Sequence, residues 1–538
     1  MAHPLAGDGS LPLRSDEVLR LQNIYKRFGS LTAIDDASLV VGRGEIHALV
    51  GENGAGKTTL MNIIYGLLAR DGGDVVLYGE SVSFSGPAQA IRAGIGMVHQ
   101  HFKLAPSFTV AENIILGSEP PARFGRIDRE RSERETGEIS RRFGLDLDPR
   151  AIVGTLPVGL RQRVEILKAL YRDAQILILD EPTAVLTPQE TRELFKTMRS
   201  LADNGHSIIF ITHKLREVLA VSDRISVMRQ GRMVGMMNNR GVTAQEIAGL
   251  MVGRPVLLRV RKGKAHASQD AVLDVAGLSA LGERSETAVD DLSLQVCAGE
   301  IVSLAGVQGN GQDELVQCIA GLRRPVAGRI AIAGTVIGTD PRANRAAGLA
   351  YIPADRGGTG LSVESGIWEN LTVGHLRRFR QGPFLKVQAA RSRATDLISD
   401  FDVRGAELDK KARSLSGGNQ QKVQIARELS RDARLIIAEQ PSQGVDIGAI
   451  EAIHRTLVEM RDAGRAVFVI SADLDEIFAI SDRILVIYRG RIVANLLADE
   501  TDPEKVGQFM GGLHESAETH QEHRGAASGE AEAVAHGH

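Results

Sequence analysis

An eight-residue segment near the start of the chain has the residue types and spacing that bind nucleotide phosphates. Residues 51–58 read Gly-Glu-Asn-Gly-Ala-Gly-Lys-Thr, between an apolar run at 46–50 and a stretch with helical spacing at 59–67. This is the P-loop pattern, in which glycines let backbone N–H groups curl around phosphate oxygens at the start of a helix. The residues expected to bind the phosphates are Gly51, Glu52, Asn53, Gly54, Ala55, Gly56, Lys57, Thr58 and Thr59.

Two side chains of this segment add specific chemistry. The ammonium group of Lys57 can reach the β- and γ-phosphates, and the hydroxyl of Thr58 suits Mg²⁺, a hard cation that prefers oxygen ligands. A glycine-rich turn that matches the pattern by chance is the alternative, and the strand-to-helix setting disfavours it. The expected cofactors are therefore ATP and Mg²⁺.

Two carboxylates follow a second apolar run. Residues 175–179 lead into Asp180 and Glu181. In a P-loop protein the strand beside the loop delivers an aspartate to the hydration shell of Mg²⁺, and we assign that role to Asp180. Glu181 faces the opposite way and is the candidate general base for the attacking water, a role worth about 10² to 10⁴ in rate. Without the P-loop, a solvated acidic strand end would explain both residues.

Three further side chains complete the predicted site. Gln100 follows the apolar segment 94–98 and can touch the metal ion or the water, and His213 follows the strand predicted at 207–211 and could hydrogen-bond the γ-phosphate. Surface turns commonly carry Gln and His, so their order after the P-loop is the stronger signal. Phe28 could stack on the adenine ring, and a place in the core is the alternative for this residue.

Length and composition limit the possible classes. With 538 residues the chain is too long for one core, and 43% hydrophobic and 24% charged residues are typical of soluble globular proteins. A net charge of -3 gives no electrostatic case for nucleic acid as the main partner. No apolar run is long enough to cross a bilayer and the first residues lack a secretion signal, so we expect a cytoplasmic protein.

The sequence contains an internal repeat. The pattern of residues 41–51 returns at 296–306, and that of 211–217 returns at 470–476. A period this long indicates two homologous domains, and each alternates β-branched runs with helical stretches, which predicts an α/β fold with a mainly parallel sheet. The predicted division is a disordered N-terminus at 1–16, a first domain at 17–254, a basic linker at 255–270, a second domain at 271–513 and a disordered tail at 514–538.

A motif in the second repeat resembles that of a known family. Residues 414–421 read Ser-Leu-Ser-Gly-Gly-Asn-Gln-Gln, which resembles the signature sequence of ABC ATPases, and the resemblance covers about residues 17–512 in two copies. It implies two tandem P-loop ABC ATPase domains, each with a mainly parallel sheet core and a helical subdomain. The domains of that family meet head to tail, so that the P-loop of one and the signature of the other hold each ATP.

The resemblance therefore assigns roles to residues of both halves. Signature residues at a helix N-terminus complete the cage around the γ-phosphate when the halves close, with Asp446 beside them. The signature residues expected to bind ATP are Ser416, Gly417, Gly418 and Asn419. The expected catalytic set is Glu181, His213, Gln100, Lys57, Ser416 and Gly418, and the expected metal-binding set is Thr58, Gln100 and Asp180.

The repeats differ at the residues that matter for chemistry. In the second repeat, Gln312 occupies the position of Lys57, and Gln440 occupies the position of Glu181. The amide of Gln440 cannot take a proton from water. The remaining replacements are Asp313 for Thr58, Glu439 for Asp180, Ala472 for His213, Ala354 for Gln100, and Pro157 for the serine of the first signature. Because the sites are shared across domains, we expect one hydrolytic site and one impaired site that binds nucleotide weakly or not at all.

The fused arrangement is similar to the energy subunits of bacterial sugar and nucleoside importers of the ribose type. Segments 97–102, 109–114 and 180–187 look closest to nucleoside members, with a ribose, galactose or xylose importer as the alternative. A soluble tandem ATPase acting on ribosomes or DNA is a further alternative, which the short linker, the impaired site and two isolated cysteines disfavour.

The resemblance also implies partners. They are integral membrane permease subunits and an extracytoplasmic solute-binding protein, with no nucleic acid. The protein would lie peripherally on the cytoplasmic face of the membrane, with residues 101–113 forming much of the groove for the permease's cytoplasmic helices.

Overall fold

The computed structural model describes residues 16–99, 102–120, 127–183, 186–255, 262–263, 265, 267–268, 270–445 and 447–512. Gln100 and Asp446, which the sequence assigns to the site, and His101 of the predicted groove lie outside the described residues. The same holds for the terminal segments 1–15 and 513–538, so the disorder predicted for the two ends remains a prediction.

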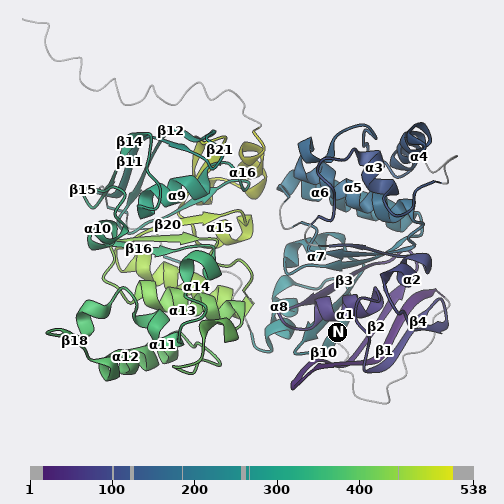
Figure 1. The fold of residues 1–538 in the computed structure, drawn as a ribbon, viewed down its shortest axis with the longest axis horizontal. Helices are drawn as coiled ribbons and strands as arrows, with labels where there is room; N and C mark the ends of the chain where they lie inside the picture. Colours follow the sequence, from purple (N-terminus) through teal and green to yellow (C-terminus); the bar gives the residue numbers. More distant parts are fainter. Residues whose placement is uncertain are drawn as a thin grey trace, which may run out of the picture.

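The first domain is built on a six-stranded sheet and a four-stranded antiparallel sheet (Figure 1). The six-stranded sheet has the order β10-β9-β3-β8-β7-β6, with β3 (Ile46–Gly51), β6 (Ile95–Val98), β7 (Ile176–Asp180), β8 (Ser207–Ile211), β9 (Arg224–Arg229) and β10 (Arg232–Asn238). Only its edge strand β10 is antiparallel to its neighbour. The four-stranded sheet has the order β2-β1-β4-β5, with β1 (Glu17–Phe28), β2 (Leu31–Gly42), β4 (Gly72–Leu77) and β5 (Glu80–Val82).

Helices cover both faces of the parallel strands. They are α1 (Lys57–Ile64), α2 (Pro87–Arg92), α3 (Val110–Ile115), α4 (Arg129–Arg142), α5 (Val158–Tyr171), α6 (Pro188–Asp203), α7 (Leu215–Val221) and α8 (Ala244–Val252). Every residue of β3, β7 and β8 is buried, as expected for parallel strands packed on both sides. Leu60 of α1 packs with Ile178 and the antiparallel sheet, whereas Phe210 packs on the other face with Val164 of α5.

The second domain repeats this plan. Its sheets have the orders β16-β19-β20-β13-β21-β22 and β12-β11-β14-β15. The strands of these two sheets are β11 (Ala271–Leu281), β12 (Thr287–Cys297), β13 (Ile301–Ala305), β14 (Ala327–Ile332), β15 (Thr335–Val336), β16 (Leu349–Ile352), β19 (Leu435–Glu439), β20 (Ala466–Ser471), β21 (Arg483–Tyr488) and β22 (Arg491–Leu497). A further two-stranded sheet consists of β17 (Arg380–Gln381) and β18 (Phe384–Leu385). The helices are α9 (Gln312–Ala320), α10 (Pro341–Ala346), α11 (Ile367–Thr372), α12 (Val387–Asp400), α13 (Gly417–Leu429), α14 (Ile447–Asp462), α15 (Leu474–Ile480) and α16 (Pro503–Met510). The predicted tandem α/β fold is confirmed.

The two domains lie side by side in opposite directions (Figure 1). The P-loop helix α1 and the signature helix α13 lie toward one end of the molecule, and α9 and α5 lie toward the other. Helix α8 contacts α14, and α16 contacts α6, so that the last helix of each domain packs on the helix that follows β7 or its counterpart β19 in the other domain. This is the orientation that head-to-tail sharing of nucleotide requires.

A pseudo-twofold relation also holds at the level of side chains. Arg216 and Asp475 occupy equivalent positions on α7 and α15 and form an ion pair of 2.6 Å between the domains. Ile447, at the start of α14, packs into the apolar cluster of Ile247 and Met251 on α8. The domains are thus joined away from the P-loop and the signature.

None of the helices in the part of the chain that the structure describes combines the length and the apolar character needed to span a bilayer.

Candidate functional site

The P-loop connects the buried strand β3 to α1 as the sequence predicts. Gly54 and Gly56 have φ angles of 81° and 103°, and a Cβ atom at Gly56 would lie 2.7 Å from the carbonyl oxygen of Ala33. This conformation therefore needs glycine. Lys57 is only 7% exposed, and its Nζ donates hydrogen bonds to the carbonyl oxygens of Gly51 at 2.7 Å and Glu52 at 3.0 Å.

Buried charges of both signs meet at the carboxyl ends of β3 and β7. Burial lowers the pKa of Lys57, and the carboxylates of Glu181 and Asp180 partly oppose that shift. Asp180 is 8% exposed, and burial together with the charge of Glu181 raises its pKa despite the attraction of Lys57. Of the two carboxylates, Asp180 is therefore the one whose charged form its surroundings disfavour.

Glu181 is held in an unusual backbone conformation. Its φ angle is 48°, and its N–H donates to the carbonyl oxygen of Ile211 at 2.9 Å. A non-glycine residue in the left-handed region is strained and persists only where the surroundings enforce it. The strain turns the carboxylate toward His213, whose Nδ1 lies 3.1 Å from Oε1 of Glu181.

The electrostatics keep Glu181 ionised. Burial alone would raise its pKa, but the hydrogen bond and charge of His213, with Lys57 and Lys214, outweigh burial and lower it. A carboxylate that stays ionised near neutral pH can accept a proton from water. The structure thus brings Lys57, Asp180, Glu181 and His213 to one edge of the sheet, as the sequence predicts.

The residues present fit a magnesium ion. Asp180 ends β7 with a carboxylate whose charged form its surroundings disfavour, and Thr58 follows Lys57 with an exposed side chain at the start of α1. Carboxylate and hydroxyl oxygens are the ligand types that Mg²⁺ takes in such sites. Thr58 and Asp180 are the residues that would hold it.

Phe28 lies at the end of β1 and is 44% exposed, with Nζ of Lys26 5.4 Å from the ring centroid. The alternative of a core position for this ring is therefore wrong. Its role in stacking on adenine stays a prediction.

The signature residues form the start of α13. Ser416 is its N-cap and is exposed, while Gly418 is buried. Asn419 donates from Nδ2 to Oγ of Ser416 at 3.0 Å, which fixes the hydroxyl at the helix N-terminus. Among the described residues, no hydrogen bond or ion pair links 416–419 to the P-loop.

The second P-loop is closed by its own side chains. Gln312 donates from Nε2 to the carbonyl oxygen of Val307 at 3.1 Å and accepts the N–H of Asn310 at 3.1 Å. Asn310 also donates from its side chain to Val307 at 2.9 Å. One backbone donor that a P-loop uses for phosphate is thus occupied by an amide.

The carboxylate that replaces Asp180 is also neutralised differently. Tyr351 donates its hydroxyl to Oε2 of Glu439 at 2.7 Å, and the N–H of Ala354 lies 3.2 Å from the same oxygen. Burial and the charge of Asp313 raise the pKa of Glu439 to about 7, although these two donors oppose the shift. No sequence pattern singled out Tyr351, because its partner lies on another strand.

The first signature has a second defect that the sequence did not reveal. Helix α5 begins after Pro157, which makes no side-chain cap. The N–H of Gly159, equivalent to Gly418, donates to Oε1 of Glu190 at 3.2 Å. Glu190 belongs to the capping box of α6, so this N–H is already paired with a carboxylate of its own domain. Only the tertiary fold brings these segments together.

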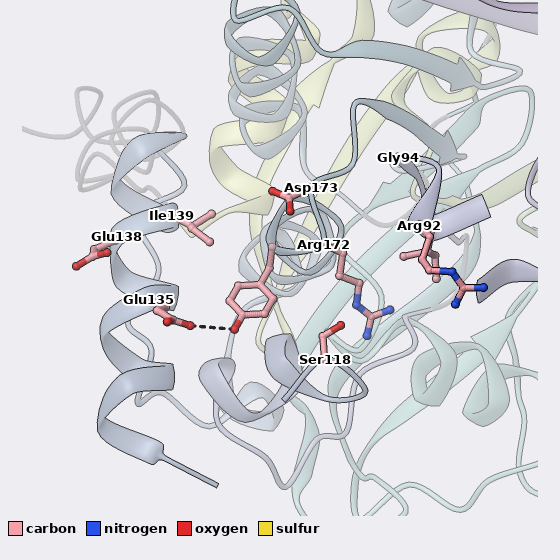
Figure 2. Close-up of a pocket in the computed structure, with 10 residues that line it drawn as sticks. Arg92, Gly94, Ser118, Glu135, Glu138, Ile139, Arg172 and Asp173 are labelled. Atoms are coloured by element: carbon pink, nitrogen blue, oxygen red, sulfur yellow. Dashed lines mark hydrogen bonds between the residues drawn. The ribbon is translucent and has the colours of Figure 1, made fainter. Parts of the chain in front are cut away.

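A separate cavity of about 600 Å³ lies in the first domain (Figure 2). Ser118, which follows α3, and Arg172, at the end of α5, line it opposite Arg92 of α2. Tyr171 donates its hydroxyl to Glu135 of α4 at 3.1 Å across one side of it. The cavity lies between the helical layer and the core, just beyond the predicted groove segment 101–113.

The family is decided by comparison with known sequences. The family described as ABC transporter matches residues 34–184 and 289–443, which covers both P-loops and both β7-type strands. The chain belongs to the ABC transporter family. As members of this family hydrolyse ATP to power transport, the chain is an ATP-binding subunit with ATPase activity.

Similar proteins indicate which branch of the ABC transporter family this chain resembles. The guanosine import ATP-binding protein NupO of Bacillus subtilis is 45% identical over 501 residues, covering 92% of this chain and 97% of that protein. The glucose import ATP-binding protein TsgD13 of Haloferax volcanii is 44% identical over 526 residues, covering 92% of this chain and 96% of that protein. A solved structure of the archaeal ribosome recycling factor aABCE1, in complex with stalk protein aP1, matches with a TM-score of 0.60 and 21% identity, covering 91% and 92%. That last likeness concerns the fold alone.

The pKa of Glu439 gives a testable pH dependence. The folded state binds this proton more tightly than the unfolded state, so the stability from Glu439 is full below about pH 4.5 and is lost as pH rises to about 7. Glu439→Gln should therefore stabilise the chain increasingly across that window, by up to about 3 kcal/mol above it. Thermal unfolding of both proteins from pH 4.5 to 8 measures this.

Asp313→Asn provides the matched control, because removing that charge lowers the pKa of Glu439 and moves the window to lower pH. An equal difference between Glu439→Gln and the parent at every pH would contradict the account.

Proposed function

We propose that the protein powers solute import, with ATP hydrolysed only in the cleft between the first P-loop and the second signature. The observation that carries this proposal is the cluster of Lys57, Asp180, Glu181 and His213 in the first domain, set against Gln312 and Gln440 in the second. The opposite directions of the domains support the pairing of α1 with α13.

Each residue of this cleft has its own role in ATP hydrolysis. Lys57 exchanges its bonds to Gly51 and Glu52 for the β- and γ-phosphates, and the P-loop N–H groups hold the remaining oxygens. Ser416 and Gly418 add donors at the N-terminus of α13. Glu181 accepts the proton of the attacking water, while His213 orients its carboxylate. Magnesium, where bound, supplies charge stabilisation on the phosphates.

The other composite site lacks each of these functions. The amide of Gln312 occupies a P-loop donor, and Glu190 occupies the N–H of Gly159 in the opposing signature. Gln440 keeps the strained backbone of its counterpart, with φ of 43°, but carries no base. We infer that this site closes with the domains without turning over ATP.

For the solute we propose a nucleoside. NupO is a guanosine import protein by name and is 45% identical, but the glucose import protein TsgD13 at 44% keeps a monosaccharide as the second candidate. Segments 97–102, 109–114 and 180–187 favour the nucleoside members. The likeness to aABCE1 gives no support for a ribosomal role, since at 21% identity it concerns the fold.

For partners we propose two membrane permease subunits and an extracytoplasmic solute-binding protein, with this subunit on the cytoplasmic face. The cavity beside Ser118 supports docking of a permease segment, because it lies where the helical layer meets the core and next to α3. A ligand wedged between these layers would move when the domains close.

Replacing the general base tests the hydrolytic site. Glu181→Gln should reduce ATP turnover at least about 10²-fold, because an amide cannot accept the proton. Gln440→Glu, the matched change in the other site, should leave the rate of the parent nearly unchanged and restore nothing in the Glu181→Gln background. Steady-state phosphate release measures both. Substantial activity of Glu181→Gln would contradict the assignment.

Competition uptake tests the solute. The cells produce the chain together with the permeases and the binding protein encoded by neighbouring genes. In these cells, uptake of labelled guanosine should be inhibited by other nucleosides and unaffected by excess ribose or glucose. Cells with Glu181→Gln provide the background. Inhibition by a sugar instead would replace the nucleoside with the second candidate.

Sedimentation tests the docking cavity. The protein should sediment with membranes only when permeases are co-expressed, and Ser118→Arg should abolish this by placing a long cation beside Arg172. Ser81→Arg, on the exposed strand β5, is the control that should sediment normally. ATPase activity in solution should stay unchanged in both. Recovery of the parent with ribosomes would count against transport.

A further inference from the structure

Arg356 lies beside the intact signature and is not part of the site described above. It begins a short π-helical segment, Arg356–Gly360, in the loop between β16 and α11. The Asp355 side chain fixes that segment by accepting the N–H groups of Gly357 and Gly358 at 3.1 and 2.9 Å. Nε of Arg356 donates to Oε1 of Gln421 on α13 at 2.8 Å, and Gln421 is only 1% exposed. The guanidinium is thus firmly held.

The guanidinium lies against two segments at once. A Cβ atom at Gly417 would lie 2.9 Å from Nη1 of Arg356, and one at Gly444 would lie 3.6 Å from both Nη atoms. Gly417 is the first residue of α13, and Gly444 belongs to the loop after β19. Both glycines leave room for the cation, and both segments face the first domain's ATP in a head-to-tail pair.

Among the described residues, Arg356 has no counter-ion. Within that part of the chain its Nη groups make no hydrogen bond and no ion pair, and burial lowers its pKa. A half-buried cation without an anion is unfavourable. The N-terminus of α13 is itself positive because of the helix dipole. Both positive charges therefore favour an anion at this helix end.

The other signature lacks this arrangement. The position equivalent to Arg356, counted from Ala354 and Gln100, is Phe102, and the signature of that domain has Pro157. A cation therefore lies against the signature that retains its serine, whereas the matching sequence position of the other half is uncharged. The difference follows the composite site rather than general folding requirements of the domain.

We propose that Arg356 is a positioning residue that makes closure of the hydrolytic cleft depend on the γ-phosphate. It acts through Gly417 and Gly444, holding the start of α13 against the loop after β19, and its field favours an anion at that helix end. ATP brings this anion when the domains close, whereas ADP does not. The inference rests on the proposed pairing of the first P-loop with the second signature.

The test uses the full chain in the Glu181→Gln background, in which ATP is bound but not hydrolysed. Closure is measured by energy transfer between dyes on the two domains, and ADP affinity by titration with a fluorescent ADP. Arg356→Gln should raise the ATP concentration for half-maximal closure about tenfold, as expected for loss of one charge-assisted interaction. ADP affinity and the unfolding temperature should stay unchanged, and Arg356→Lys should restore part of the response.

Arg393→Gln, which removes an exposed guanidinium from α12, is the control and should close as the parent does. Equal closure of Arg356→Gln and the parent would overturn the inference, as would a parallel loss of ADP affinity. If the Glu181→Gln parent itself failed to close with ATP, the proposed pairing would fall together with the inference.

Discussion

Charge buried at the carboxyl ends of parallel strands is the constraint that organises this molecule. Lys57 and Asp180 are almost fully buried, and burial disfavours the charged form of each. Each charge stabilises the other in part, while Glu181, which His213 contacts, favours the charged form of Lys57 and disfavours that of Asp180. In the proposed mechanism, a divalent cation would favour the charged form of Asp180. The neighbouring domain would supply a further helix N-terminus to the γ-phosphate, that of α13.

The same constraint explains the second nucleotide position. Once the lysine is replaced by Gln312, a buried carboxylate there has no cation, and Glu439 is instead held by Tyr351 with its pKa raised to about 7. In the second P-loop, the backbone N–H of Asn310 donates to the side-chain amide of Gln312. In the opposing signature, Glu190 accepts the N–H of Gly159. The groups that would bind phosphate at this position are thus paired within their own domains.

Local patterns in the sequence were sufficient to predict much of the fold and of the candidate site. The P-loop, the strand that ends in Asp180 and Glu181, the repeat and the signature helix all depend on spacing within one segment, and the structure contains each as predicted. The roles of the site residues remain predictions. Glu190, Tyr351 and Arg356 could not be predicted, because each acts on a segment that only the tertiary fold brings near. Phe28 differs from these three residues, because what could not be predicted from the adjacent sequence was the exposure of its own side chain.

The central claim is that one of two similar clefts holds and hydrolyses ATP. The most direct measurement is the stoichiometry of ATP retained by the Glu181→Gln protein in the presence of Mg²⁺. The account predicts one tightly bound ATP per chain, lost on replacement of either Lys57 or Ser416, since these residues belong to the same cleft on opposite domains. Two equivalent ATP molecules per chain, or retention that depends on Gln312 and not on Lys57, would contradict it.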